Sequence, residues 1–316
     1  MKLGKYWGYI LLIIVVFAVP VVVRNDYYLH ILVLCAINIM LTASLRSIAT
    51  SGQISLGHAG FMCIGAYASA IMSMKFGVPV YASMLLGGVT ALVVAAIISY
   101  PITRVKTVYF VMLTMFLGTV VTLVVTQWRS LTGGTTGIIN IPPLGTISIF
   151  GLSIDFSSKM PNLYFAIILM LIILLFLYRI DRSYIGSTLQ AISQDDTLVA
   201  SIGINLVKYK IIMFCIGCFI AGLVGGFYAH YMSVIVPNSF SLFYSIYLLV
   251  YMIVGGTNRF AGAILGAFIL TLVPEVSRVF LEYQPFIFVL VLYLVIFLLP
   301  GGLVSLPKYI LSRIKK

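Results

Sequence analysis

The residues of this chain that could carry out chemistry are few, and their spacing fits no catalytic or nucleotide-binding motif. The 316-residue sequence has one Gly-Lys pair, Gly4-Lys5, and no G-x-x-x-x-G-K-[ST] loop of the kind that cradles ATP phosphates. It has no H-E-x-x-H motif, and its three histidines (His30, His58 and His230) have no catalytic or metal-binding partner nearby in sequence. We therefore expect no enzyme, no metal site and no cofactor bound by this chain.

The remaining reactive side chains point the same way. Cys215 and Cys218 form a C-x-x-C inside an apolar run, without a charged neighbour that would lower the pKa of a thiol, so we interpret them as packing residues. An ion-driven carrier usually places an acid within a membrane span. Most of the seven acids lie in predicted loops, and Glu275 is the one that could lie within a span. This distribution favours energy input from a partner protein over ion coupling.

The elements that position these residues must face lipid. The chain is 62% apolar and 8% charged, whereas soluble domains carry about 25% charged residues. Apolar runs approach the roughly 20 residues that cross a bilayer. We expect an all-α, polytopic transmembrane helical bundle that forms one membrane domain, residues 1–316. The predicted spans are about 6–23, 27–45, 59–74, 80–100, 107–126, 162–178, 210–235, 242–256, 260–280 and 285–304.

The basic residues orient these ten spans. With the N-terminus inside, 14 of the 19 Lys and Arg residues fall in inner segments and 5 in outer ones, as the positive-inside rule requires. Both termini are then cytoplasmic. Because the charges flank the spans, the net charge of +12 does not indicate nucleic-acid binding. The run 6–23 resembles a signal peptide, but no small-x-small cleavage site follows it, so we expect a retained first span.

The longest inner segment, a loop of about residues 183–210, holds a predicted amphipathic helix from Ser187 to Ile202. Apolar residues recur at helical spacing on one face: Leu189, Ile192, Val199 and Ile202. Polar residues occupy another face: Gln194, Asp195 and Asp196. Glycines bound the helix at Gly186 and Gly203. Such a helix suits insertion into a groove of a cytoplasmic protein. The alternative is a helix lying on the membrane lipid, which the two acids disfavour because inner leaflets are anionic.

A polar segment lies at about residues 46–58. Gly52, Gln53, Ser55, Gly57 and His58 combine polar groups with glycines that permit an unwound backbone, so they are candidates for a translocation path. The alternative is a cytoplasmic re-entry of the chain in which the glycines act as hinges. We interpret His230 as interfacial.

Close helix packing is also predicted. Gly222-x-x-x-Gly226 and Gly262-x-x-x-Gly266 lack side chains that would hold neighbouring helices apart. We interpret Asn38 and Thr114 as hydrogen-bonding between helices.

Several of these stretches resemble the branched-chain amino-acid ABC permease family, in its LivM-like branch. The loop stretch 189–210 resembles the family's coupling loop, and Ser51-Gly-Gln-Ile-Ser-Leu-Gly-His-Ala-Gly60 its signature. Further matches occur in the family's order at 131–134, 221–226, 255–256, 262–266 and 299–303. The family usually has a basic residue where Ser193 stands, small residues at Leu198 and Val199, and a glycine at Asn258.

The resemblance implies a permease subunit in a bacterial cytoplasmic (inner) membrane. Its partners would be cytoplasmic ABC ATPase subunits that use the ATP, a second permease subunit and an extracytoplasmic solute-binding protein. The solute would be leucine, isoleucine, valine, or a related amino acid, amide or urea. The competing hypothesis is a stand-alone secondary carrier or channel for a small polar solute.

Overall fold

Long apolar helices make up most of the chain in the computed structural model, which describes residues 25–149, 152–155, 158–257, 259–277, 284–298 and 301–305. The long helices are α2 (Asp26–Ala49), α3 (His58–Phe76), α4 (Val80–Thr103), α5 (Thr107–Gln127), α7 (Lys159–Asp181), α10 (Leu206–Met232), α11 (Leu242–Gly255), α12 (Phe260–Val276) and α13 (Gln284–Leu298). Each of the nine predicted spans after residue 25 contains one of them. The first predicted span, 6–23, and both termini lie outside the described residues.

Seven described segments are long and apolar enough to cross a membrane, and α12 is a shorter apolar helix. The chain is therefore a multi-pass, α-helical membrane protein. The count of ten spans and the side on which the termini lie stay predictions.

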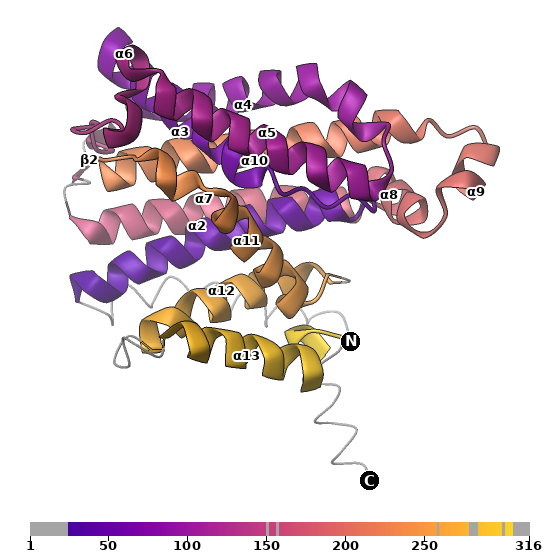
Figure 1. Ribbon diagram of the computed structural model, residues 1–316. Coiled ribbons are helices and arrows are strands. Elements are labelled where there is room, and N and C mark those ends of the chain that lie inside the picture. Colours follow the sequence, from indigo (N-terminus) through magenta and orange to yellow (C-terminus); the bar gives the residue numbers. More distant parts are fainter. Residues whose placement is uncertain are drawn as a thin grey trace.

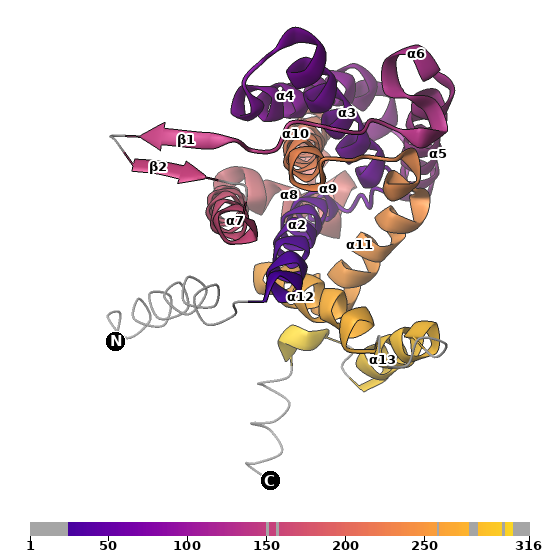
Figure 2. The same cartoon turned by 90° about the vertical axis from the view of Figure 1, so that its left-hand side faces the viewer.

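The helices run roughly parallel, with α2 and α10 inside the bundle and α4, α5, α7 and α11 around them (Figure 2). Helix α10 packs against α2, α3 and α4, while α2 also contacts α7, α11 and α12. Exposed apolar side chains line the outer helices, for example Phe116 on α5 and Ile172 on α7. This distribution suits a surface that faces lipid or another membrane subunit.

The two glycine motifs hold helices in backbone contact, as predicted. A Cβ on Gly222 would lie 2.8 Å from the carbonyl oxygen of Gly87 on α4. A Cβ on Gly266 would lie 2.0 Å from the carbonyl oxygen of Tyr251, which places α12 directly on α11. Neither contact leaves room for a side chain.

The loop 127–161, which the predicted topology places outside and which is called the outer loop below, contains strands as well as helices. After the short helices α6 (Arg129–Thr132) and η1 (Gly134–Thr136), strands β1 (Thr146–Ile149) and β2 (Leu152–Asp155) pair antiparallel, with Thr146 opposite Asp155. Alternating Thr, Ser and Ile residues favour such a hairpin. The bundle itself is all-α, as predicted, and the loop adds a small β-hairpin at the end of the bundle opposite to α8 and α9 (Figure 1).

His230 is buried, so its interfacial assignment was wrong. Its side chain is 1% exposed, with Nε2 2.9 Å from Ser69 Oγ and 3.0 Å from Ser83 Oγ, and Nδ1 2.7 Å from the Pro142 carbonyl oxygen. The contacts join α10 to α3, α4 and the outer loop. Flanking tyrosines suggested the headgroup layer, but the loop around Pro142 covers this end of α10.

Candidate coupling surface and translocation path

The loop 183–210, which the predicted topology places on the inner side and which is called the inner loop below, folds into two helices at one end of the bundle. Helix α8 spans Tyr184–Gln194 and α9 spans Asp196–Ser201, with Asp195 extended between them (Figure 1). The Asp195 carboxylate accepts hydrogen bonds from the amides of Thr197 and Leu198 at 3.0 and 3.1 Å and from the Thr197 hydroxyl at 2.7 Å. Asp195 is therefore the N-cap of α9. The prediction of one continuous helix over 187–202 was wrong because this cap starts a second helix.

Hydrogen bonds lower the pKa of Asp195 from its usual value. The bond from the Thr197 hydroxyl has the largest effect, and the bond from the Leu198 amide has the next largest. The carboxylate is thus held ionised at neutral pH. Asp196 is exposed in the first turn of α9, where a negative charge suits the helix N-terminus.

The two glycines that bound the loop do different things. Gly203 has a φ of +81°, a left-handed conformation that favours glycine, and it follows α9 as the predicted stop. Gly186 lies inside α8, where a Cβ would be 2.4 Å from the Asp181 carbonyl oxygen. It therefore fixes α8 against the end of α7.

The predicted apolar stripe faces the chain itself. Leu189, Ile192 and Val199 are buried against the bundle, so they are not the surface that a partner would meet, which corrects the predicted use of this face. The fourth residue of the predicted stripe, Ile202, is exposed at 69%, and so are Leu198 at 63% on α9 and Tyr184 at 69% on α8. A spacing of about 3.6 residues between apolar side chains identifies an apolar helix face, but it does not show whether the chain itself or a partner covers that face.

The candidate path residues belong to an irregular segment, 50–57, between α2 and α3. Gly52 has a φ of +79°, and its carbonyl accepts from the hydroxyl of Thr107 at the start of α5. The Leu56 amide donates to Thr114 Oγ1, seven residues further along α5, at 3.1 Å. Since a helix rises about 1.5 Å per residue, the segment descends about 10 Å from the inner end of the bundle. It is a loop that enters the bundle.

The side chains of this segment are buried and mostly hydrogen-bonded. Gln53 Nε2 donates to the Thr103 carbonyl at 3.2 Å, and Ser55 Oγ accepts from the Gly57 amide at 3.3 Å. His58 Nε2 lies 2.7 Å from Ser44 Oγ on α2, while its Nδ1 has no hydrogen-bond partner among the described residues. His58 is therefore held against α2 through Nε2, and its other ring nitrogen, Nδ1, has no partner among the described residues.

Of the two side chains predicted to hydrogen-bond between helices, Asn38 does so, whereas Thr114 bonds to the irregular segment 50–57. Asn38 on α2 donates to Thr271 Oγ1 on α12 at 3.0 Å and accepts from the Tyr244 hydroxyl on α11 at 2.7 Å. Thr114 Oγ1 accepts from the Leu56 amide. Sequence reasoning missed Tyr244 and Thr271, since nothing local to either marks a partner on another helix.

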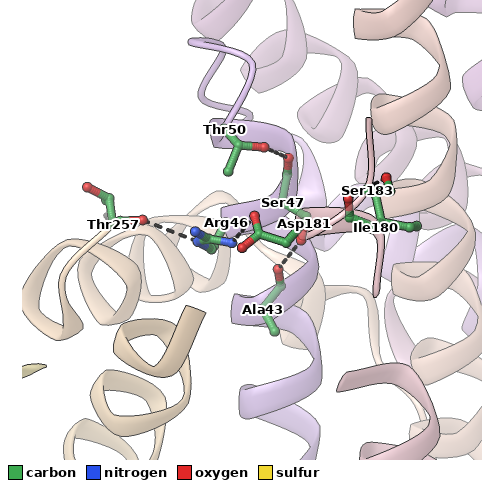
Figure 3. A network of polar contacts seen from close by, with 8 residues as sticks. All are labelled: Ala43, Arg46, Ser47, Thr50, Ile180, Asp181, Ser183 and Thr257. Atoms are coloured by element: carbon green, nitrogen blue, oxygen red, sulfur yellow. Dashed lines mark hydrogen bonds and ion pairs between the residues drawn. The ribbon is translucent and has the colours of Figure 1, made fainter. Parts of the chain in front are cut away.

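An ion pair between Arg46 and Asp181 was also missed. The two residues are 135 positions apart, and their side-chain nitrogen and oxygen lie 2.7 Å apart at the inner ends of α2 and α7 (Figure 3). Sequence analysis counted each as a separate inner-side charge. The one available signal was that each residue follows an apolar run at an end that the predicted topology places on the same side of the membrane.

The chain was compared with known proteins. The family described as the permease component of a branched-chain amino acid transport system matches residues 27–300. The chain belongs to this permease family. It is 26% identical, over 279 residues, to the high-affinity branched-chain amino acid transport system permease protein LivM of Escherichia coli K12. It is 25% identical, over 279 residues, to the protein of the same name from Salmonella typhimurium LT2.

Each match covers 83% of this chain and 66% of the relative, so the permease spans slightly less than two thirds of the length of these relatives. No solved structure gives a significant match. Family membership agrees with the resemblance found in the sequence.

Proposed function

We propose that this permease is the membrane subunit of an ATP-driven importer in a bacterial cytoplasmic membrane. Its solute would be leucine, isoleucine or valine, as the names of its relatives suggest, or a related amino acid, amide or urea. Ten spans would place both termini in the cytoplasm. The chain would bind no nucleotide, because its sequence has no phosphate-cradling loop, and partner ATPase subunits would hydrolyse the ATP.

One observation carries the coupling part of this proposal. Helices α8 and α9 extend beyond one end of the bundle, fixed from behind by Gly186, and they present Leu198 and Ile202 outward. Exposed apolar side chains on a short rigid helix suit a hydrophobic groove on a cytoplasmic protein. An ATPase that binds there could move the inner ends of the helices.

The path part of the proposal rests on the segment 50–57 and His58. It enters the bundle from the end that carries α8, and the Cβ position of Gly52 lies 3.3 Å from Ser193 Cα on α8. The unpaired Nδ1 of His58 would gain a partner from solute or water when the path opens. A second permease subunit would complete the path, and an extracytoplasmic binding protein would deliver solute.

Reconstitution tests the proposal directly. The chain is co-expressed with the ATPase, permease and binding-protein genes beside its own, and the complex is inserted into vesicles. Labelled leucine, isoleucine and valine, with urea and acetamide in parallel, should enter only when the vesicles contain ATP. A partner ATPase whose P-loop lysine is replaced is the control. Uptake driven by an ion gradient without ATP would instead establish the secondary-carrier alternative.

A further inference from the structure

The Arg46–Asp181 ion pair lies directly behind the inner helices. It joins Nη1 of Arg46, in the last turn of α2, to the carboxylate of Asp181, the last residue of α7, at 2.7 Å. The two side chains are only 3% and 15% exposed. It is the sole salt bridge within the described part of the chain.

The same guanidinium binds a third segment. Its Nε donates to the carbonyl oxygen of Thr257, in the turn between α11 and α12, at 3.2 Å (Figure 3). Its central carbon lies 5.6 Å from the ring centroid of Phe260. A guanidinium has five donors in a fixed plane, so one arginine can hold several partners in a defined geometry. Arg46 thereby connects α2, α7 and the α11–α12 turn.

Asp181 is mechanically continuous with α8. A Cβ on Gly186 would lie 2.4 Å from the Asp181 carbonyl oxygen and 2.5 Å from that of Ile180. The Ser183 amide and hydroxyl both donate to the Ile180 carbonyl, at 3.0 and 2.7 Å. The start of α8 therefore cannot tilt towards α7 without displacing the backbone that carries Asp181.

Arg46 is equally close to the segment 50–57. The Thr50 amide donates to the Arg46 carbonyl at 3.0 Å, directly before Ser51 and Gly52. A polar pocket of about 230 Å³ separates this end of α2 from α8, with Arg46 and Thr50 facing Gln190, Ser193 and Gln194. Beside this pocket the ion pair joins α2 to the end of α7, and Gly52 approaches Ser193 of α8.

Stability alone does not account for this pair. Removing two charges from water costs free energy that offsets much of their attraction, and buried pairs can often be replaced by apolar residues without loss of stability. We propose that Arg46 and Asp181 are a positioning pair, which transmits movement of α8 and α9 to the inner end of α2 and to the α11–α12 turn. This inference rests on the proposed function.

The test uses the reconstituted complex and three readouts: ATPase copurification, ATP hydrolysis, and solute taken up per ATP hydrolysed. The variants are Asp181→Asn, the exchanged pair Arg46→Asp with Asp181→Arg, and the apolar pair Arg46→Met with Asp181→Leu. Arg182→Gln is the matched control, because Arg182 is the next residue and its guanidinium lies over the Tyr178 ring without contacting Asp181. The thermal midpoint of each purified variant reports folding.

We expect Asp181→Asn and the apolar pair to copurify with the ATPase and hydrolyse ATP, while uptake per ATP falls at least about fivefold, the lower range of coupling between sites. The exchanged pair should recover part of the uptake, because it restores the ion pair between α2 and α7 but an aspartate at position 46 cannot donate to the Thr257 carbonyl. Arg182→Gln should match the original chain. Wild-type uptake by the apolar pair would overturn the proposal, as would loss of ATPase binding in Asp181→Asn. An original complex without ATP-dependent uptake would instead contradict the proposed function.

Discussion

A Cβ on Gly65 would lie 2.1 Å from the carbonyl oxygen of Gly222, so α3 and α10 touch backbone to backbone near the middle of the bundle. Helix association in lipid depends on such close packing, because lipid is as apolar as the side chains that it replaces. The contact also fixes the depth of α3 relative to α10. Since α3 begins at His58, it sets the position of that residue.

Replacing Gly65 with alanine should therefore destabilise the fold. We expect Gly65→Ala to lower the thermal midpoint of the purified protein, at a cost of about 1–3 kcal/mol, because the added methyl group meets backbone that cannot rotate away. Gly88→Ala is the matched control, since its Cβ would meet ring atoms of Phe219 at 3.0 Å, which can shift. Equal midpoints for both variants would contradict the backbone contact between α3 and α10.

The exposed apolar side chains of α9 should anchor the ATPase. We expect Leu198→Asp and Ile202→Asp to weaken copurification of the ATPase, each by about 1 kcal/mol or more, as at an interface hot spot. Tyr184→Asp is the control, because Tyr184 is exposed on α8, outside the α9 segment that holds both anchors. If neither α9 variant weakens binding while Tyr184→Asp does, the contact surface lies on α8 instead.

The cap formed by Asp195 should make α9 tolerant of mild acid. Its folded-state pKa is lowered, so the stabilisation is present above the unfolded-chain value of about 3.9 and is lost as pH falls through the folded value. We expect the amides of residues 195–201 to keep the same protection against hydrogen exchange, relative to their intrinsic rates, from pH 8 down to pH 5. Asp195→Ala should exchange faster throughout, because the Thr197 and Leu198 amides lose their acceptor.

Asp195→Asn and Asp196→Asn are the controls for this cap. An asparagine at position 195 still offers an oxygen to both amides, so its exchange should stay close to that of the original chain. Position 196 is exposed and is not the cap. Slow exchange in Asp195→Ala would show that α9 does not depend on the cap.

The candidate path can be tested at Gln53 and His58. Each side chain is buried with one identified hydrogen bond, so Gln53→Leu removes a donor to the Thr103 carbonyl and His58→Leu removes a partner of the Ser44 hydroxyl. If the residues also contact solute, uptake should fall by about fivefold or more, which corresponds to one hydrogen bond of about 1 kcal/mol. His30→Leu is the control, since His30 pairs with Tyr231 near the other end of the bundle. Unchanged uptake in both variants, with normal assembly, would support the hinge alternative.

The spans were predictable because lipid imposes a length and a composition on each of them. The predicted run 107–126 and the helix Thr107–Gln127 differ by one residue, since apolarity ends where the bilayer ends. Contacts between distant residues were not predictable. Arg46 reaches Asp181 across 135 positions, and neither residue carries a local signal of the other.

The inner loop shows the same limit at short range. The Asp195-Asp196-Thr197 stretch contained an N-cap signal, but the regular spacing of Leu189, Ile192 and Val199 favoured one long helix. Cap geometry decided the outcome, because a carboxylate that accepts from the amides two and three residues further on caps the start of a new helix. Which apolar face a partner covers then depends on packing that a single sequence does not contain.

The topology is testable by labelling single cysteines placed at Lys159 and Asp195. Helix α7 starts at Lys159 and has 23 residues, so it is about 34 Å long, enough to cross a hydrocarbon core of about 30 Å. Asp195 lies beyond its other end, between α8 and α9. In a background without Cys35, Cys63, Cys215 and Cys218, an impermeant thiol reagent added outside whole cells should label Lys159→Cys alone. It should reach Asp195→Cys only in inverted vesicles, and labelling of both positions from the same side would contradict the ten-span topology.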